Sequence, residues 1–252
     1  MSPEERRNKI ITLLDEKKFI TVHTLVTQLF SSEATIRRDL TFLEKEGYLK
    51  RTAGGALSIK EYYREQPFDF KSKTHMEQKK YIAGLAMDFI SSYQTIFMDS
   101  SSTCTYLARR MTSLDNLTIL CNGLPTCELL SANETNTVYS PGGTVLARNG
   151  SVIGSDTARF IEKHYADIAF MSCRGLDAGF GASDFVEEII NIKKSFRRNS
   201  TQVVLLLDSS KFGKKFFFQS LSLAEIDVVI SDTRPPADIQ AALDANNIEM
   251  IY

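Results

Sequence analysis

The spacing of apolar residues predicts three short helices at the start of the chain. In each, apolar residues recur every three or four positions among charged and polar ones, so they share one helical face. The three segments are 4–18, 21–30 and 32–46, the last ending before Gly47. Thr21 can cap the second helix and Ser31 or Ser32 the third, because a hydroxyl accepts a free N–H of the first turn. The short turn between the second and third helices is typical of a helix-turn-helix.

The third segment has the residue types of a helix that reads DNA. Ile36, Leu40 and Leu43 share its inward face. Arg38 lies on another face, and Arg37 lies at the edge between them. An arginine in the major groove can bind a guanine edge with two hydrogen bonds, or it can contact a phosphate. The same pattern also suits an ordinary amphipathic surface helix with solvated arginines, so the neighbouring segments decide between the two.

Two short extended segments follow the third helix and meet at the glycine pair Gly54-Gly55. This pattern predicts a β-hairpin. Lys50 and Arg51 lie on the first strand of the hairpin, where they can contact DNA phosphates. A glycine pair alone indicates only a tight turn, but after three helices of this spacing it favours a winged helix-turn-helix.

This first part of the chain resembles the N-terminal signature of the DeoR family of bacterial sugar-operon regulators. The matching residues are Thr35-Ile36-Arg37-Arg38-Asp39-Leu40, Leu43-Glu44, Gly47, Leu49, Arg51 and Gly54-Gly55-Ala56. Ser31 departs from the family, which has an apolar residue there. The resemblance and the hairpin together imply DNA contacts at Ser32, Glu33, Thr35, Arg37, Arg38, Lys50, Arg51, Gly54 and Gly55, with Ala34 contributing to operator choice.

The segment after the hairpin is polar and aromatic, with Pro67 in its middle. Proline disfavours a helical conformation at the residue before it, so Pro67 separates two pieces of chain. A helical pattern of apolar residues resumes at Glu77. We therefore expect a winged helix-turn-helix domain at 1–58, a linker at 59–76 and a larger effector-sensing domain at 77–252.

From residue 94 onward, short apolar runs alternate with helical patterns. The expected strands are 95–98, 117–120, 137–139, 168–171, 203–207, 228–230 and 249–251. The expected helices include 106–111, 124–130, 186–196 and 238–245. Runs that are apolar on both faces and separated by helices are typical of a mainly parallel sheet, so the expected fold class is α/β. In such sheets, ligands bind beyond the carboxyl ends of the strands.

Polar residues follow five of these strands. Hydroxyls and free N–H groups at a helix start suit a phosphate, a glycine pair lets the backbone approach a ligand, and lysine or arginine adds positive charge. Each feature alone is typical of a cap, a turn or a solvated side chain. Their shared position favours a small phosphorylated or polyhydroxylated ligand. The residues expected to bind it are Asp99, Ser101, Ser102, Thr103, Asn122, Gly142, Gly143, Arg174, Asp208 and Lys211.

The resemblance to the DeoR family continues in this second part. It rests on Asp99-x-Ser101-Ser102-Thr103, Asn122, Gly142-Gly143, Asp167-x-Ala169-Phe170, Gly175 and Asp208-Ser209-Ser210-Lys211-Phe212. It implies an effector domain similar in fold to ribose-5-phosphate isomerase. By the same resemblance, this domain binds sugar phosphates, and their binding weakens the binding of the protein to DNA. The sequence departs from the family in two places: Ser101 replaces a glycine, and Cys121-Asn122-Gly123 replaces Thr-Asn-Ser.

Composition and charge narrow the class of protein. A chain with 43% hydrophobic and 24% charged residues is typical of a globular protein, and no apolar run approaches the roughly 18 residues of a membrane span. The first residues lack the apolar stretch of a secretory signal, and the four cysteines lack metal-binding spacing. We therefore expect a cytoplasmic protein that does not associate with a membrane and that binds no metal or other cofactor. Residues 1–60 carry eleven Lys/Arg against eight Asp/Glu, so a mildly basic head joins an acidic body.

These patterns predict a DNA-binding transcriptional regulator, not an enzyme: a repressor of a carbohydrate-metabolism operon, released from operator DNA by a phosphorylated sugar. A homo-oligomer, dimer or tetramer, is expected because paired heads bind one operator more tightly than a single head. One alternative is a sugar-phosphate isomerase with an appended DNA-binding module, in which Asp177 and Asp184 could transfer protons. Turn-forming aspartates explain these two residues better. The other alternative is an effector-independent DNA-binding protein.

Overall fold

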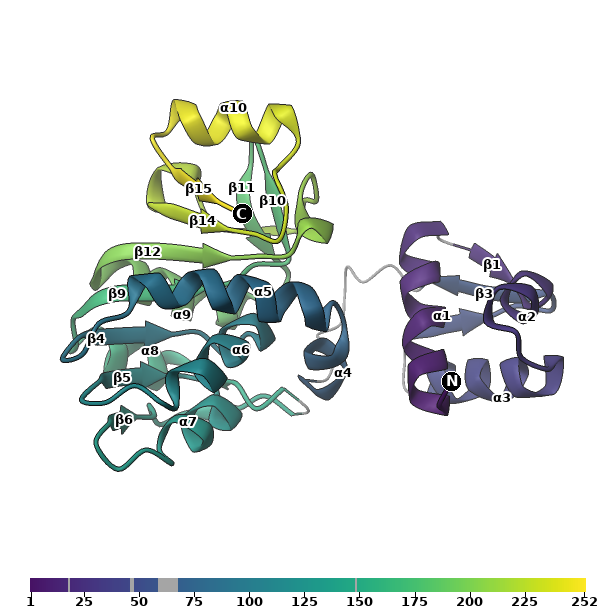
Figure 1. The fold of residues 1–252 in the computed structure, drawn as a ribbon, viewed down its shortest axis with the longest axis horizontal. Coiled ribbons are helices and arrows are strands. Elements are labelled where there is room, and N and C mark those ends of the chain that lie inside the picture. Colours follow the sequence, from purple (N-terminus) through teal and green to yellow (C-terminus); the bar gives the residue numbers. More distant parts are fainter. Residues whose placement is uncertain (18, 46–47, 59–67, 148) are drawn as a thin grey trace. The chain divides into compact units, whose positions relative to one another are not determined.

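A computed structural model describes residues 1–17, 19–45, 48–58, 68–147 and 149–252 (Figure 1). The chain divides into two compact units, residues 1–64 and 65–252. Two features expected from the sequence, the helix-terminating Gly47 and the break at Pro67, lie outside the described residues. None of the helices in the described ranges has the length and apolar content needed to cross a bilayer.

The first unit contains three helices and a small antiparallel sheet. The helices are α1 (Pro3–Lys17), α2 (Val22–Leu29) and α3 (Glu33–Lys45). The strands β1 (Phe19–Thr21), β2 (Leu49–Arg51) and β3 (Gly55–Ser58) are ordered β1-β3-β2. The predicted hairpin is thus confirmed as β2–β3, and β1 adds a third strand. The side chains that fill the core include Ile10, Leu14, Leu25, Ile36, Leu40, Leu43 and Leu49.

Capping residues fix where α2 and α3 begin. The Thr21 hydroxyl accepts the N–H of Thr24 at 3.1 Å, which confirms Thr21 as the cap of α2. Ser32 caps α3, since its hydroxyl accepts the N–H of Thr35 at 3.2 Å. Phe30 ends α2 in the left-handed conformation (φ 48°) and turns the chain toward α3. The resulting α2–turn–α3 is a helix-turn-helix.

The second unit is built on a seven-stranded sheet in which every neighbouring pair of strands is parallel. The strand order is β15-β14-β12-β9-β4-β5-β6. In chain order the strands are β4 (Thr95–Met98), β5 (Thr118–Cys121), β6 (Thr137–Tyr139), β9 (Ala166–Met171), β12 (Ser200–Leu206), β14 (Val228–Ile230) and β15 (Glu249–Ile251). These are the seven strands expected from the apolar runs, with ends that differ by at most three residues. The predicted α/β fold class is confirmed.

Helices cover both faces of this sheet (Figure 1). One layer contains α5 (Met76–Ala86), α6 (Ser102–Met111) and α7 (Leu124–Leu130). The other contains α8 (Ser155–Ile161), α9 (Glu187–Arg198) and α10 (Ala237–Ala245). Alternate residues of each strand enter opposite layers: Phe97 packs under α9, whereas Ile96 and Met98 pack under α5 and α6. Both faces are therefore buried, as the continuous apolar runs predicted.

Several elements of this unit were not expected from the sequence. A second, antiparallel sheet contains β10 (Gly175–Asp177), β11 (Gly181–Asp184) and β13 (Phe218–Leu221). The strands β7 (Thr144–Val145) and β8 (Val152–Ile153) form a separate hairpin. Within the stretch expected to be a linker, residues Phe68–Lys73 form helix α4. Short 3-10 helices follow α5 at Met87–Phe89 (η2), β12 at Ser209–Lys211 (η3) and β13 at Leu223–Glu225 (η4).

The glycine-rich segment 175–181 is the β10–β11 hairpin. Asp177 forms the expected turn, since its carboxylate accepts the N–H groups of Gly179 and Phe180 at 2.9 Å. The turn-forming interpretation is wrong for Asp184, which is buried on β11 with an oxygen 2.6 Å from the Nζ of Lys193. A buried carboxylate needs such a partner because charge is poorly solvated in the interior.

Candidate functional site

The exposed side of α3 carries the residues predicted to contact DNA. Ser32, Glu33, Arg37 and Arg38 are exposed, and Thr35 is half-buried. Arg37 pairs with Glu33 one turn earlier, with 2.7 Å between nitrogen and oxygen. The side chain of Arg38 makes no hydrogen bond or ion pair with any residue that the structure describes. Its guanidinium is therefore available for a base edge or a phosphate.

The opposite side of α3 holds a buried carboxylate that the sequence analysis missed. Asp39 is 1% exposed and accepts hydrogen bonds from the Nε atoms of Arg6 (2.5 Å) and Arg7 (2.9 Å) on α1. The Arg7 guanidinium also lies over the ring of Phe42, 3.8 Å from its centroid. These contacts fix α3 against α1. The burial of Asp39 could have been predicted from its position, because it lies three residues after Ile36 and so shares the inward face of the helix.

The hairpin is joined to α3 through Arg51. Its side chain donates to the hydroxyl of Thr41 at 2.7 Å, and its backbone N–H donates to the carboxylate of Glu44 at 2.8 Å. Lys50, by contrast, is exposed. The hairpin is therefore held beside the recognition helix, with Lys50 directed to solvent and Arg51 shared between hairpin and helix.

The two glycines of the hairpin have different surroundings. Gly54 is exposed, and a Cβ added there would meet nothing within 4 Å. Gly55 is buried where β3 pairs with Thr21 of β1, and an added Cβ would lie 2.1 Å from the carbonyl oxygen of Ile20. Close approach of β1 thus requires glycine at position 55 for a structural reason.

In the second unit, eight of the ten predicted effector residues follow the carboxyl ends of four adjacent strands, β12, β9, β4 and β5, whereas Gly142 and Gly143 follow β6. The Nζ of Lys211, after β12, donates to the hydroxyl of Ser172, after β9, at 3.0 Å. The backbone N–H of Ser172 in turn donates to the carboxylate of Asp99, after β4, at 2.9 Å. Burial alone would raise the pKa of Asp208, but the Lys211 ammonium and the Ser210 hydroxyl hold it below its usual value. This chain of contacts connects three of the four strand ends.

Asp99 acts here as an organising residue. Its Oδ1 accepts the N–H of Ser101 at 2.9 Å, and its Oδ2 lies 3.9 Å from the Nζ of Lys193 on α9. Lys193 also donates to the carbonyl of Ser172 at 2.6 Å. Burial opposes its charge, but Asp184 and Asp99 outweigh that effect and raise the pKa of Lys193. The two aspartates and Lys193 therefore form a buried ionic cluster beneath the strand ends.

The loop after β4 leads into α6, whose first two residues, Ser102 and Thr103, are buried. Ser101 caps α6, since its hydroxyl accepts the N–H of Cys104 at 3.2 Å. With φ at −73°, this position does not require the glycine that the family usually has. The N–H groups of Ser102 and Thr103 belong to the first turn and have no acceptor among the described residues. Both can bind an anion.

Asn122, after β5, presents an unpaired acceptor. It is 1% exposed, and its Nδ2 donates to the carbonyl of Val152 at 3.1 Å. Its Oδ1 is buried and has no hydrogen-bond partner in the described part of the chain. A buried acceptor without a donor costs free energy, so a ligand that donates a hydrogen bond there would be favoured.

The predicted pair Gly142–Gly143 lies against β8 and α8. The hydroxyl of Thr157 donates to the carbonyl of Gly142 at 2.8 Å. Gly143 has a φ of 151°, and an added Cβ would lie 2.1 Å from Thr157 Oγ1. This close packing gives Gly143 a structural reason to be glycine.

Further basic residues lie near the strand ends, and the sequence analysis did not predict one of them, Lys79. Lys79, on α5, is 4% exposed, and its Nζ donates to the backbone carbonyls of Lys71 and Thr74. Burial, and then the nearby charge of Lys211, lower the pKa of Lys79 to about 7. Arg174 lies over the ring of Phe185 at 4.8 Å. A signal for Lys79 was present, because it shares the buried face of α5 that the apolar pattern marks.

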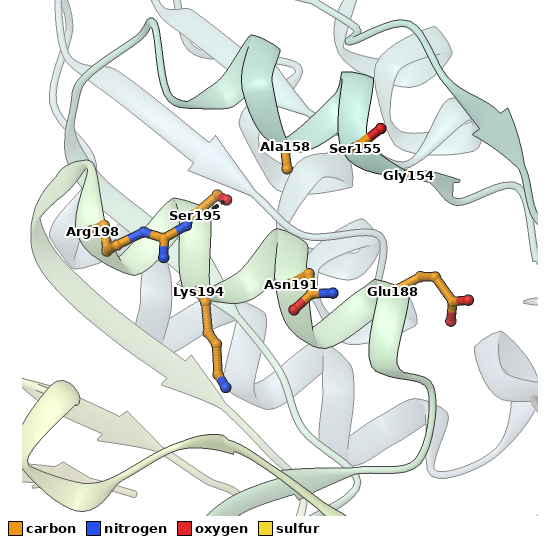
Figure 2. A pocket seen from close by; sticks show the side chains of 8 residues that line it. All are labelled: Gly154, Ser155, Ala158, Glu188, Asn191, Lys194, Ser195 and Arg198. Carbon is orange, nitrogen blue, oxygen red and sulfur yellow. Dashed lines mark hydrogen bonds between the residues drawn. The ribbon is translucent and has the colours of Figure 1, made fainter.

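A separate cavity of about 330 Å³ lies between α8 and α9 (Figure 2). Its lining consists of Gly154, Ser155, Ala158, Glu188, Asn191, Lys194, Ser195 and Arg198. None of the predicted effector residues lines it. The described residues also contain no group of three or more histidine, cysteine, aspartate or glutamate side chains that could hold a metal ion.

A winged helix-turn-helix unit followed by an α/β unit with a polar site at its strand ends defines a DNA-binding transcriptional regulator. Residues 6–62 match the model of a DeoR-like helix-turn-helix domain, and residues 74–233 match that of the DeoR C terminal sensor domain. The chain therefore belongs to the DeoR family, which confirms the predicted family.

Two relatives that are named as transcriptional regulators agree with this assignment. The HTH-type transcriptional regulator YulB of Bacillus subtilis (strain 168) is 34% identical over 95% of this chain and 93% of its own length. The glycerol-3-phosphate regulon repressor of Escherichia coli (strain K12) is 28% identical over 99% of both chains. Among solved structures, ribose 5 phosphate isomerase A from Neisseria gonorrhoeae aligns over 55% of this chain and 54% of its own, with a TM-score of 0.41 and 15% identity.

Proposed function

We propose that this protein is a repressor of a carbohydrate-metabolism operon and that a phosphorylated sugar releases it from operator DNA. One arrangement supports the effector: Lys211, two free N–H groups of α6 and the unpaired Oδ1 of Asn122 all lie at adjacent strand ends. A phosphate suits the lysine and the N–H groups, and a sugar hydroxyl can donate to the asparagine. A similar protein is named for a glycerol-3-phosphate regulon, which is also consistent with a phosphorylated polyol.

The proposed DNA contacts are those expected from the sequence, with Arg38 as the leading residue for base recognition. We also propose that the protein acts as a homo-oligomer, since two linked heads bind one operator far more tightly than one head. The effector would then favour an arrangement of the second unit in which the DNA-binding units are poorly placed to bind DNA.

The DNA-binding part of the proposal can be tested with single substitutions. Arg38→Ala should lower operator affinity by roughly ten- to hundredfold at fixed salt, the effect of losing one arginine contact to a base. Lys9→Ala removes an equal charge from an exposed position on α1 and should cost much less. Equal affinities of Arg38→Ala and wild type would overturn the role given to α3.

The effector part requires a different variant. Lys211→Met should bind operator as wild type does but should need at least tenfold more sugar phosphate for release, because the ammonium at the strand ends is gone. Unchanged release in Lys211→Met would overturn the proposed location of the phosphate. Both measurements use fluorescence anisotropy of labelled operator DNA.

A further inference from the structure

Lys79 is a buried basic residue whose amino group contacts the end of α4. Its Nζ lies 2.7 Å from the carbonyl oxygen of Thr74 and also donates to the carbonyl of Lys71. The last carbonyls of a helix lack partners within the helix, and they carry partial negative charge. An ammonium at this place therefore stabilises the end of α4 more strongly than a neutral amine would.

Helix α4 is also attached to the effector site through its backbone carbonyls. The hydroxyl of Ser102, at the start of α6, donates to the carbonyl of Lys71 at 3.3 Å, so Lys71 accepts from both Ser102 and Lys79. The hydroxyl of Tyr106 donates to the carbonyl of Ser72 at 2.9 Å. The Lys71 ammonium reaches Asn149 Oδ1 at 2.9 Å. The position of α4 thus depends on groups at the edge of the effector site.

The charges around Lys79 are mostly of its own sign. Lys211 and Asp208 face it from the loop after β12, Arg174 from the loop after β9, and Lys71 from α4. Asp208 is the one carboxylate in this set, against three other cations. Burial and these cations disfavour the protonated form of Lys79, which is why its pKa falls to about 7. An anion bound near Lys211 would reverse the balance of charge.

We propose that Lys79 is the positioning residue through which an anion bound at Lys211 fixes helix α4. This inference rests on the proposed function, because it takes the effector phosphate as the anion. The bound anion favours the ammonium form of Lys79, and the ammonium holds the carbonyls of Lys71 and Thr74 with stronger, charge-assisted hydrogen bonds. Helix α4 begins at Phe68, directly after the segment 59–67 that leads from the DNA-binding unit. Binding at the strand ends is thereby coupled to the start of the effector unit.

Calorimetric titration with sulfate tests the coupling. Sulfate is a dianion whose charge does not change near neutral pH, so any proton taken up from the buffer on binding is bound by a group of the protein. At pH 7.5, in buffers of different ionisation enthalpy, the full-length wild type should take up as much as about 0.7 proton per sulfate, because Lys79 is mostly neutral before binding. Hydrogen exchange of residues 68–74 should slow when sulfate binds.

Three variants complete the test. Lys79→Met should bind sulfate without proton uptake and without slower exchange in α4. Lys79→Arg stays charged at pH 7.5, so it should show slow exchange in α4 even without sulfate, and it too should take up no proton. Lys80→Met, a matched control, removes an exposed lysine paired with Glu77 and should behave as wild type.

The outcomes separate the inference from the proposed function. Sulfate binding to Lys79→Met with wild-type proton uptake and wild-type protection of α4 would overturn the role of Lys79 and leave the anion site intact. If Lys79→Met does not fold, unprotected α4 in Lys79→Arg without sulfate would overturn it equally. Failure of millimolar sulfate to bind the wild type would overturn the anion site itself, and the inference with it.

Discussion

Replacing Asp39 by alanine should destabilise the DNA-binding unit selectively. Asp39 joins the recognition helix α3 to α1 by accepting from Arg6 and Arg7, and its side chain is 2% exposed. The substitution leaves two arginines without their carboxylate, and the side chain of Arg6 is only 11% exposed. A guanidinium buried there without a carboxylate is destabilising, because its desolvation is no longer offset by an ion pair.

The expected size of this effect follows from the burial of the pair. Breaking a buried ion pair from one side costs about 3–5 kcal/mol, and the lower end applies here because Arg7 remains 26% exposed. A unit of this size has a total stability of roughly 3–10 kcal/mol. A loss of about 3 kcal/mol should therefore speed exchange of the most protected α3 amides by about a hundredfold or more.

Hydrogen exchange followed by mass spectrometry measures both units in one sample. Amides of α1–α3 should lose protection in Asp39→Ala, while those of the seven-stranded sheet serve as an internal reference. Glu33→Ala breaks the exposed pair with Arg37 and should cost about 0.5 kcal/mol or less. Equal protection of α3 in Asp39→Ala and Glu33→Ala would refute the role of the buried carboxylate.

Three further predictions test other parts of the structure. Gly55→Ala should destabilise the DNA-binding unit by about 1–3 kcal/mol, because its Cβ meets the Ile20 carbonyl, while Gly54→Ala should have little effect; thermal melting compares the two. Ser101→Ala should cost about 1 kcal/mol in urea unfolding through loss of the α6 cap, and Ser101→Gly only a few tenths. The pKa of Lys79, about 7 when folded, lies below its unfolded value, so the unfolded state binds more protons between them. Stability should therefore rise with pH above 7 in the wild type, and this rise should be weaker in Lys79→Met.

The seven-stranded sheet could be predicted because its strands are buried on both faces. Phe97 and its neighbours Ile96 and Met98 enter different core layers, so the sequence shows an unbroken apolar run. The turns between strands and helices then place polar residues at the carboxyl ends. This is why Asp99, Ser172 and Lys211, which are far apart in the sequence, could be expected at one edge of the sheet.

The second sheet gave no comparable signal. Strand β11 reads Gly-Ala-Ser-Asp, which is neither apolar nor alternating, and its partner β13 lies more than thirty residues later. Pairing at that distance depends on the tertiary fold and leaves no local pattern.

For the buried charged residues, the sequence predicts the burial but not the partners. Periodicity places Asp39 and Lys79 on inward faces of their helices, but their partners are set by packing: Arg6 and Arg7 for the first, carbonyls of α4 for the second. Glycines behave similarly. The sequence marks Gly55 and Gly143 as unusual, yet only the structure shows that neighbouring backbone and Thr157 leave no room for a side chain.

The proposed function requires that one chain binds operator DNA and releases it in response to a sugar phosphate. This can be measured by fluorescence anisotropy with DNA from upstream of the protein's own gene, with a panel of sugar phosphates added at fixed salt. Salt is fixed because phosphate contacts make DNA affinity strongly salt-dependent. We predict tight binding that one sugar phosphate weakens in the wild type and weakens far less in Lys211→Met. Tight binding that no member of the panel changes would contradict sugar-phosphate sensing.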